Sequence, residues 1–400
     1  MDFGLTPEHR AVRDRCLELA ADFATRSAGH DRDASPPTEN YDILRKEGFL
    51  TLTVPKAFGG QGVSFLGHTL AYEALGQGCP STALAFNMHA SVVNPVLESS
   101  EVSDAAKRYL ADLVVTHGKL IGGNFSEPGH TSFIGERPLT AQAYRVPGGG
   151  YRITARKMFA SMLEAADYVL VLAYPDGETA NTAGALMCVP HDAPGRTVNR
   201  NWDVLGMRAT RSDSLLLDDC AVGEEAALLW TDDLRVFRQS FFNWFWGSYT
   251  AVYLGVGVAA YDELRRVVLG RQAAGYTQPM AYHPDVRRHV AELSADLEAA
   301  RLIVYRSAWL SDTQGPTAET TAALYRAKYA VGQAVAKITR VALTIAGAHA
   351  IFKGSRLEQL FRDGALATIQ PPQVDFCLWS MGIYELGLNP ADVLPPMRLG

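Results

Sequence analysis

Residues 122–129 read Gly-Gly-Asn-Phe-Ser-Glu-Pro-Gly, and they lie where the pattern of the chain changes. Before this stretch, apolar residues recur at three- and four-residue spacing from Thr6 to about Ala24, and further helical segments follow to about His117. After it, short β-prone runs separated by glycine and proline turns continue to about Gly223. Taken alone, the stretch is typical of a turn.

Long helical patterns return after about Leu229. One set of apolar residues alternates steps of four and three and therefore shares a helix face: Val286, Val290, Leu293, Leu297, Ala300 and Val304. We predict an α+β protein with an N-terminal α-helical domain (1–117), a middle β domain (118–228) and a C-terminal helical bundle (229–400).

The composition narrows the possible functions. The 400 residues carry a net charge of −6 and are 48% hydrophobic, so no basic stripe favours nucleic acid or an anionic membrane. No uninterrupted apolar run approaches the roughly 18 residues of a membrane span. The N-terminus does not resemble a signal peptide, and five scattered cysteines predict neither disulfides nor a metal site. We expect a cytoplasmic protein that acts on a small molecule.

Three further segments differ from ordinary scaffold. In residues 156–161, Phe159 and Ser161 are two apart, and in a strand they would share one face, where a planar ring could be stacked and hydrogen-bonded. Residues 201–212 combine a tryptophan, two arginines and hydroxyls. The pair Arg362 and Asp363 precedes a Gln-Pro-Pro run and could simply cap a helix end.

In this order, these segments resemble the acyl-CoA dehydrogenase superfamily. The resemblance covers nearly the whole chain, through the motifs at 5–8, 48–60, 126–129, 157–159, 205–208 and 357–363. It implies a helical N-terminal domain, a middle β domain and a C-terminal four-helix bundle. It also implies a dimer or tetramer, with a flavin held between the β domain and the bundle.

The resemblance assigns cofactor roles to particular residues. It places Phe125 and Ser126 at the flavin pyrimidine edge, and Phe159 and Ser161 at the ring face and N5. Arg271 stands where a family arginine reaches a neighbouring subunit's FAD.

Two further positions concern the ligands of this family. Ser132 stands where the family contacts the pantetheine or phosphates of a thioester substrate, although Phe133 replaces the aspartate that normally follows. Ala273, Ala274 and Thr344 replace residues usual at the adenine end of FAD. FMN, or a diffusible flavin supplied reduced by a partner reductase, is therefore as plausible a cofactor as FAD.

The catalytic base of a family dehydrogenase has no counterpart at the expected positions. Removal of an α-proton needs a carboxylate within hydrogen-bond reach. The family spacing after Asp363 leads to Pro371, and the alternative position within residues 243–249 carries no acid.

One branch of the superfamily does without that carboxylate, namely the two-component flavin monooxygenases of the dibenzothiophene monooxygenase type. Asn124, Ser161, Trp202 and His89 match residues of that branch, and Gln370 stands where it carries a histidine. Apolar walls of a substrate site could come from Phe86, Trp244, Phe245 and Trp246. For these aromatic residues and for His89, an ordinary place in the core is the competing interpretation.

Three hypotheses follow. The first is a monooxygenase that uses reduced flavin and O2 on a small organic or carrier-bound substrate, with Asn124, Ser161, His89 and Gln370 as catalytic candidates and Ser132, Trp202 and Trp246 contacting substrate. The second is an FAD-dependent acyl-thioester dehydrogenase with another base. The third is a catalytically silent subunit of a mixed oligomer.

Overall fold

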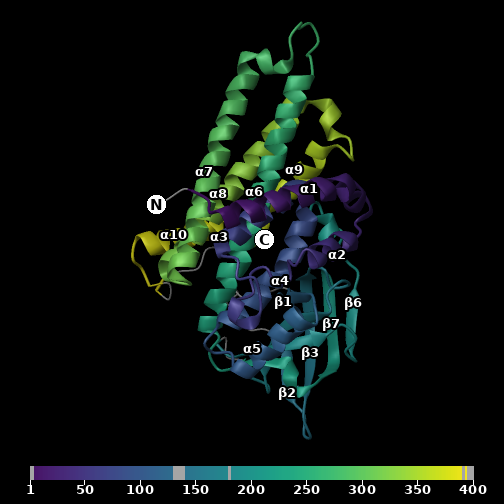
Figure 1. Cartoon of the computed structure of the whole chain (residues 1–400), viewed down its shortest axis with the longest axis vertical. Coiled ribbons are helices and arrows are strands. Elements are labelled where there is room, and N and C mark those ends of the chain that lie inside the picture. The colour runs from purple at the N-terminus through teal and green to yellow at the C-terminus, as the bar shows by residue number, and fades with distance from the viewer. Residues whose placement is uncertain (1–3, 129–139, 179–181, 390–391, 394–400) are drawn as a thin grey trace.

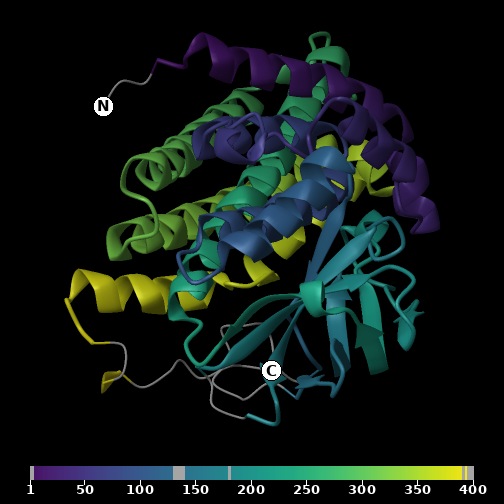
Figure 2. The ribbon, with the colours of Figure 1, turned by 60° about the horizontal axis from the view of Figure 1, so that its bottom comes forward.

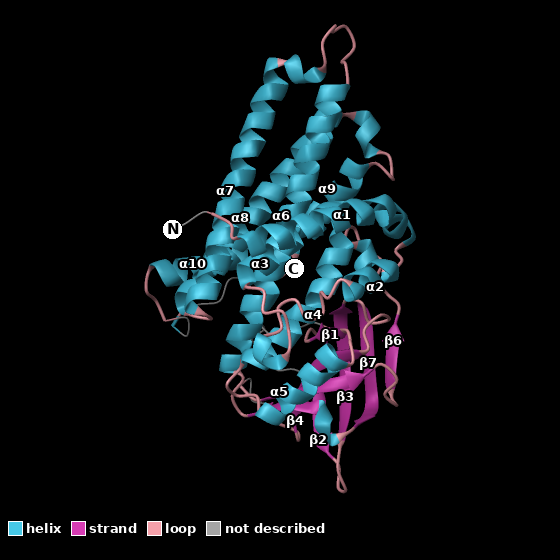
Figure 3. Ribbon diagram, viewed as in Figure 1, coloured by secondary structure: helices cyan, strands magenta, loops and turns pink. Residues whose placement is uncertain are grey.

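The computed structural model describes residues 4–128, 140–178, 182–389 and 392–393. Helices build the upper part of the molecule and a β-sheet lies at its lower end (Figures 1 and 3). The order along the chain is α, then β, then α. The predicted α+β architecture is therefore confirmed.

The N-terminal helices begin with α1 (Pro7–Asp33), whose first turn is capped by the Thr6 hydroxyl accepting from the His9 amide. The helix continues well beyond the predicted end near Ala24, up to Ala34, which adopts a left-handed conformation (φ 46°). The others are α2 (Thr38–Lys46), α3 (Phe65–Gly78), α4 (Pro80–Glu98) and α5 (Asp104–Ala111), with short turns η1 (Lys56–Phe58) and η2 (Asp112–Thr116).

The described strands form one eight-stranded sheet in the order β6-β7-β3-β2-β4-β5-β8, with β1 pairing with β4. They are β1 (Ile121–Asn124), β2 (Gln142–Arg145), β3 (Tyr151–Ala160), β4 (Tyr168–Pro175), β5 (Gly184–Pro190), β6 (Arg196–Asn199), β7 (Asp213–Val222) and β8 (Ala227–Thr231), with short turns η3 (Arg208–Thr210) and η4 (Glu224–Ala226). Strand β8 straddles the predicted domain boundary at residue 228. Figure 2 shows the sheet on one side of the helical body.

In the described residues of the C-terminal part there are five helices: α6 (Arg235–Gly270), α7 (Pro284–Gln314), α8 (Ala318–Ala346), α9 (Arg356–Ile369) and α10 (Val374–Glu385), with short turns η5 (Met280–Tyr282) and η6 (Ala348–Ile351). The predicted apolar stripe lies on α7, where Leu293, Leu297, Ala300 and Val304 are buried. Helix α6 packs on α3, α4, α7, α8 and α9 and so forms the axis of the molecule. Within the described residues, no helix is long and apolar enough to cross a membrane.

Candidate active site

Asn124 is the last residue of β1, at the junction of sheet and helices. Gly123 permits this position, because a Cβ there would lie 2.3 Å from the Val92 side chain on α4. Asn124 is only 2% exposed, and both its amide nitrogen and its amide oxygen lack a hydrogen-bond partner. A buried amide normally has partners, so Asn124 is a candidate for contact with a ligand.

Phe125 directs its ring from the end of β1 onto α6. Its centroid lies 4.7 Å from that of Phe241, which stacks on Phe245 at 5.2 Å. Tyr249 and Tyr253 continue the same face of α6 toward its C-terminal half. We call Phe241, Phe245, Tyr249 and Tyr253 the aromatic row; at 1.5 Å per residue it spans about 18 Å.

Gln370 lies at the far end of the aromatic row. The Tyr253 hydroxyl donates to Gln370 Oε1 at 2.5 Å, and the Tyr249 hydroxyl donates to the carbonyl of Pro371. Because Oε1 accepts from Tyr253, the amide nitrogen of Gln370 is the group left to donate to a ligand. Helix α6 thus connects Gln370 with the end of β1, although 245 residues separate Phe125 from Gln370 in sequence.

A buried ion pair fixes the turn that follows Phe125. Lys157 Nζ lies 2.6 Å from Glu127 Oε1, and both side chains are fully buried. Lys157 also donates to the Leu172 carbonyl, and Glu127 accepts from the backbone and hydroxyl of Thr140. Burial lowers the pKa of Lys157. Burial alone would raise the pKa of Glu127, but the Lys157 charge and the Thr140 hydrogen bonds outweigh it and leave that pKa below its usual value.

Beside this ion pair, Met158 donates its amide hydrogen to the Ser126 carbonyl at 3.1 Å. This bond brings Phe125 and Ser126 next to Phe159, so the predicted flavin contacts from β1 and from β3 do lie together. Phe159 is 49% exposed, and its ring meets the Trp202 ring edge to face at 6.1 Å.

The prediction that Phe159 and Ser161 share a strand face is wrong. The pairing of β3 with β7 is irregular between Lys157 and Ala160, and Phe159 adopts a left-handed conformation (φ 61°). Strand alternation therefore ends before Ser161, which lies in the following turn. A phenylalanine in this conformation carries strain, and strain of this kind is concentrated at functional sites.

Ser161 belongs to a row of hydroxyls. Its Oγ lies 2.7 Å from Ser212 Oγ, which lies 2.8 Å from Thr210 Oγ1. Thr210 donates to the Met207 carbonyl at 2.9 Å, and the Trp202 indole donates to the same carbonyl at 3.2 Å. The hydroxyls of residues 201–212 are visible in the sequence, but nothing local indicates that Thr210 and Ser212 connect to Ser161.

Arg362 and Asp363 lie inside α9 and do not cap its end, contrary to the capping interpretation. Arg362 binds Asp31 of α1 and donates to the Leu205 carbonyl. Asp363 accepts from the Met207 amide at 2.6 Å, whereas its other oxygen has no partner. The pair thus attaches the loop at 205–207 to the bundle. Burial raises the pKa of Asp363 to about 7.

Replacing Asp363 with asparagine is expected to change how stability depends on pH. Asp363 deprotonates near pH 3.8 when unfolded and near 7 when folded, so the wild type loses stability as pH rises between these values. The asparagine side chain keeps the acceptor for Met207 and avoids the buried charge. We expect Asp363→Asn to be more stable than wild type at pH 8 by at least about 1 kcal/mol, with the difference shrinking toward pH 5. Urea unfolding at both pH values tests this, and an equal difference at both would contradict it.

His89 is buried on α4, and both its ring nitrogens are occupied. Nε2 donates to the Leu50 carbonyl at 3.0 Å, and Nδ1 accepts from the Ile121 amide at 3.0 Å. Burial lowers its pKa to about 4, so the ring is neutral at pH 7. His89 therefore has no nitrogen left for a ligand, and the catalytic role suggested by the sequence does not fit. Its bonds instead hold the start of β1 against α4.

Trp246 packs against α8. Its ring stacks on Phe242 at 4.0 Å and lies 5.2 Å from Tyr325 of α8, and its indole nitrogen has no partner. The structure therefore does not bring Trp246 together with Phe125 and Ser161. Ser132, the other predicted substrate contact, lies outside the described residues.

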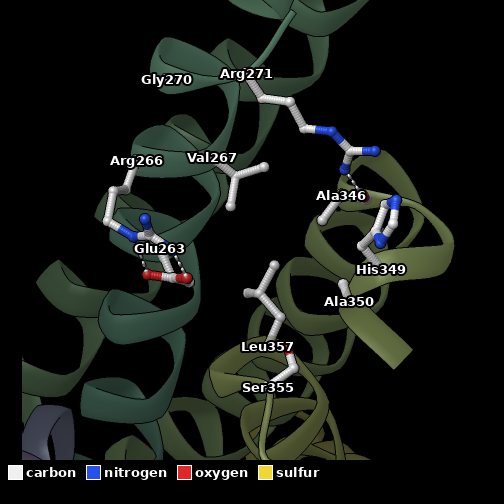
Figure 4. Close-up of a pocket in the computed structure, with 10 residues that line it drawn as sticks. All are labelled: Glu263, Arg266, Val267, Gly270, Arg271, Ala346, His349, Ala350, Ser355 and Leu357. Carbon is white, nitrogen blue, oxygen red and sulfur yellow. Dashed lines mark hydrogen bonds and ion pairs between the residues drawn. The ribbon is translucent and has the colours of Figure 1, made fainter. Parts of the chain in front are cut away.

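Arg271 follows the C-terminal end of α6 and borders a cavity of about 420 Å³ (Figure 4). Its guanidinium donates to the Ala346 carbonyl at 2.6 Å, across the opening from Glu263 and Arg266. Phe241 and Arg271 are thirty residues apart, which on an α-helix is about 45 Å. One chain therefore cannot place Arg271 and Phe125 on the same flavin.

Comparison with known proteins gives matches over almost the whole chain. Residues 6–116, 124–220 and 234–370 match the N-terminal, middle and C-terminal domains of acyl-CoA dehydrogenase. A putative acyl-CoA dehydrogenase of Bacillus subtilis, YdbM, is 28% identical over 369 residues, which cover 92% of this chain and 94% of that protein.

Two solved structures with bound FMN share the fold. KijD3, in complex with FMN and an amino-sugar nucleotide, has a TM-score of 0.84 and 24% identity, covering 98% of this chain and 96% of its own. TdsC of Paenibacillus sp. A11-2 has a TM-score of 0.84 and 22% identity, covering 94% and 97%. With all three domain models matched in order, the chain belongs to the acyl-CoA dehydrogenase superfamily.

Proposed function

We propose that this protein is a flavin-dependent monooxygenase that uses reduced FMN and O2 to oxidise a small organic substrate. The observation that carries the proposal is the buried, unpartnered amide of Asn124 beside Phe125. It offers a neutral donor and acceptor to a bound ligand. Gln370, at the other end of the aromatic row, offers a neutral donor, and the neighbouring Pro371, to which the family spacing of the dehydrogenase carboxylate leads, has no side-chain base.

The residues at the end of β1 and after β3 fit a flavin ring. Phe159 presents an exposed aromatic face that the backbone holds in a strained conformation. Asn124 and Ser161 supply hydrogen-bonding groups, and Phe125 supplies an apolar edge. When bound, the flavin would supply the redox chemistry with O2. The protein's part is to orient the ring and to exclude water from it.

FMN is favoured over FAD by Ala273, Ala274 and Thr344, which replace residues that the family usually carries at the adenine end of FAD. Arg271 lies about 45 Å along α6 from Phe241, so it could reach only the flavin of a neighbouring subunit. A flavin reduced by a partner reductase would then reach the site by diffusion.

The aromatic row favours a substrate with an apolar ring or chain. Its faces contribute apolar area and ring-edge contacts, and its two tyrosine hydroxyls are already used by Gln370 and Pro371. TdsC was solved with indole and KijD3 with an amino-sugar nucleotide, so these two molecules are suitable first substrates to test.

The test uses the purified protein, FMN, NADH and a flavin reductase under ¹⁸O2. We expect an oxygenated product that carries one ¹⁸O atom, less free H2O2 than with the reductase alone, and no product without the protein. Co-purified FAD that loses its colour with butyryl-CoA would instead support the dehydrogenase. No flavin binding and no turnover would support the silent subunit.

A further inference from the structure

Three hydroxyls connect the predicted flavin face to a backbone carbonyl. They run from Ser161 through Ser212 to Thr210, with oxygens 2.7 and 2.8 Å apart, and end on the Met207 carbonyl. Ser161 and Ser212 are at most 9% exposed, and Thr210 is fully buried. Solvent therefore has little access to this chain of hydrogen bonds.

The direction of proton donation along the chain follows from its last member. A carbonyl oxygen only accepts, so the Thr210 hydroxyl donates its single proton to the Met207 carbonyl. Ser212 must then donate to Thr210, and Ser161 must donate to Ser212. Ser161 is left with lone pairs and no proton for a ligand.

We propose that this hydroxyl chain makes the site selective for reduced over oxidised flavin. The inference rests on the proposed function and on the position of flavin N5 at Ser161 that the family resemblance implies. Reduced flavin carries a hydrogen on N5 and can donate to Ser161 with the chain as it stands. Oxidised flavin has an accepting N5, and Ser161 can donate to it only if all three hydroxyls reverse and Thr210 gives up its bond to Met207.

Counting hydrogen bonds gives the size of the effect. Reduced flavin adds one bond to the chain, whereas oxidised flavin gains one at N5 and loses one at Met207. A net hydrogen bond of this kind corresponds to a preference of about two- to tenfold. The hydroxyl chain therefore changes the ratio of the dissociation constants of oxidised and reduced FMN by about two- to tenfold.

Ser212→Ala interrupts the chain and frees the proton of Ser161. We expect the dissociation constant of oxidised FMN to fall about two- to tenfold and that of reduced FMN to stay within about twofold. Thr210→Val should give the same pattern, because it removes the terminal donor. Ser161→Ala should do the opposite, weakening reduced FMN by a similar factor and leaving oxidised FMN nearly unchanged.

Both dissociation constants are measured by fluorescence titration, anaerobically for reduced FMN. The midpoint potential of the protein-bound FMN gives an independent check of their ratio. A tenfold change in that ratio corresponds to about 30 mV for two electrons. Equal weakening of both forms in Ser212→Ala and Thr210→Val would overturn the inference, since a purely structural role predicts that result. If the wild-type protein binds neither form of FMN, the proposed function itself fails. If it binds both forms, the ratios of the two dissociation constants in the variants decide whether the hydroxyl chain acts as proposed.

Discussion

Asn124→Leu is expected to stabilise the flavin-free protein and to weaken FMN binding at the same time. Leucine has a similar size and no polar atoms, so it removes the penalty of an unpaired buried amide, about 1–3 kcal/mol. It also removes the donor and the acceptor that we assign to the ligand. Two lost hydrogen bonds, about 2 kcal/mol together, weaken reduced FMN about 30-fold. Urea unfolding without flavin and anaerobic FMN titration measure the two effects.

Asn87 provides a matched control. It is also a fully buried asparagine, but its nitrogen donates to Ser91 and its oxygen contacts His68 Nε2. Asn87→Leu leaves His68 Nε2 unpaired, whereas Ser91 keeps its bond to the carbonyl of residue 87, and the variant should destabilise the flavin-free protein by about 1–3 kcal/mol. Destabilisation of Asn124→Leu by a similar amount would mean that Asn124 has partners in the free protein. Unchanged FMN affinity would remove Asn124 from the flavin site.

Lys157→Met should cause the largest loss of stability. The substitution keeps much of the side-chain volume but leaves Glu127 buried without its cation, which costs about 3–5 kcal/mol. That is a large part of the stability of an ordinary domain. The ion pair also fixes the turn in which Met158 bonds to Ser126, so we expect weaker FMN binding as well.

A second substitution separates the buried charge from other causes. In Lys157→Met/Glu127→Gln, the glutamine oxygen still accepts from Thr140 but carries no charge. We expect urea unfolding to show that most of the lost stability returns. A loss below about 1 kcal/mol in the single variant, or no recovery in the double variant, would contradict a role for the ion pair in holding this turn.

Much of the fold follows from local patterns in the sequence. Thr6 was expected at the start of the first helix and does cap it, and the stripe through Leu293, Leu297 and Val304 is buried as its spacing indicates. The order of helices and strands follows from the same kind of information. Periodicity predicts these features because the spacing of apolar residues depends only on the type of element and on which of its sides faces the core.

The site depends on contacts between distant parts of the chain. The sequence drew attention to Phe125, Ser126 and Phe159, and the bond from the Met158 amide to the Ser126 carbonyl joins the two segments that carry them. It gave no sign that Phe159 lies at a β-bulge or that Asp363 holds the Met207 amide, 156 residues away.

The α+β architecture, the family motifs and the lack of a carboxylate at residues 370–372 can all be read from the amino-acid sequence. Tertiary packing is needed to see that both nitrogens of His89 have hydrogen-bond partners while the amide of Asn124 has none. The residues beside them in the sequence do not show which of the two side chains finds partners. Whether a buried polar atom is satisfied depends on the backbone that packs against it, and for His89 that backbone lies 39 and 32 residues away.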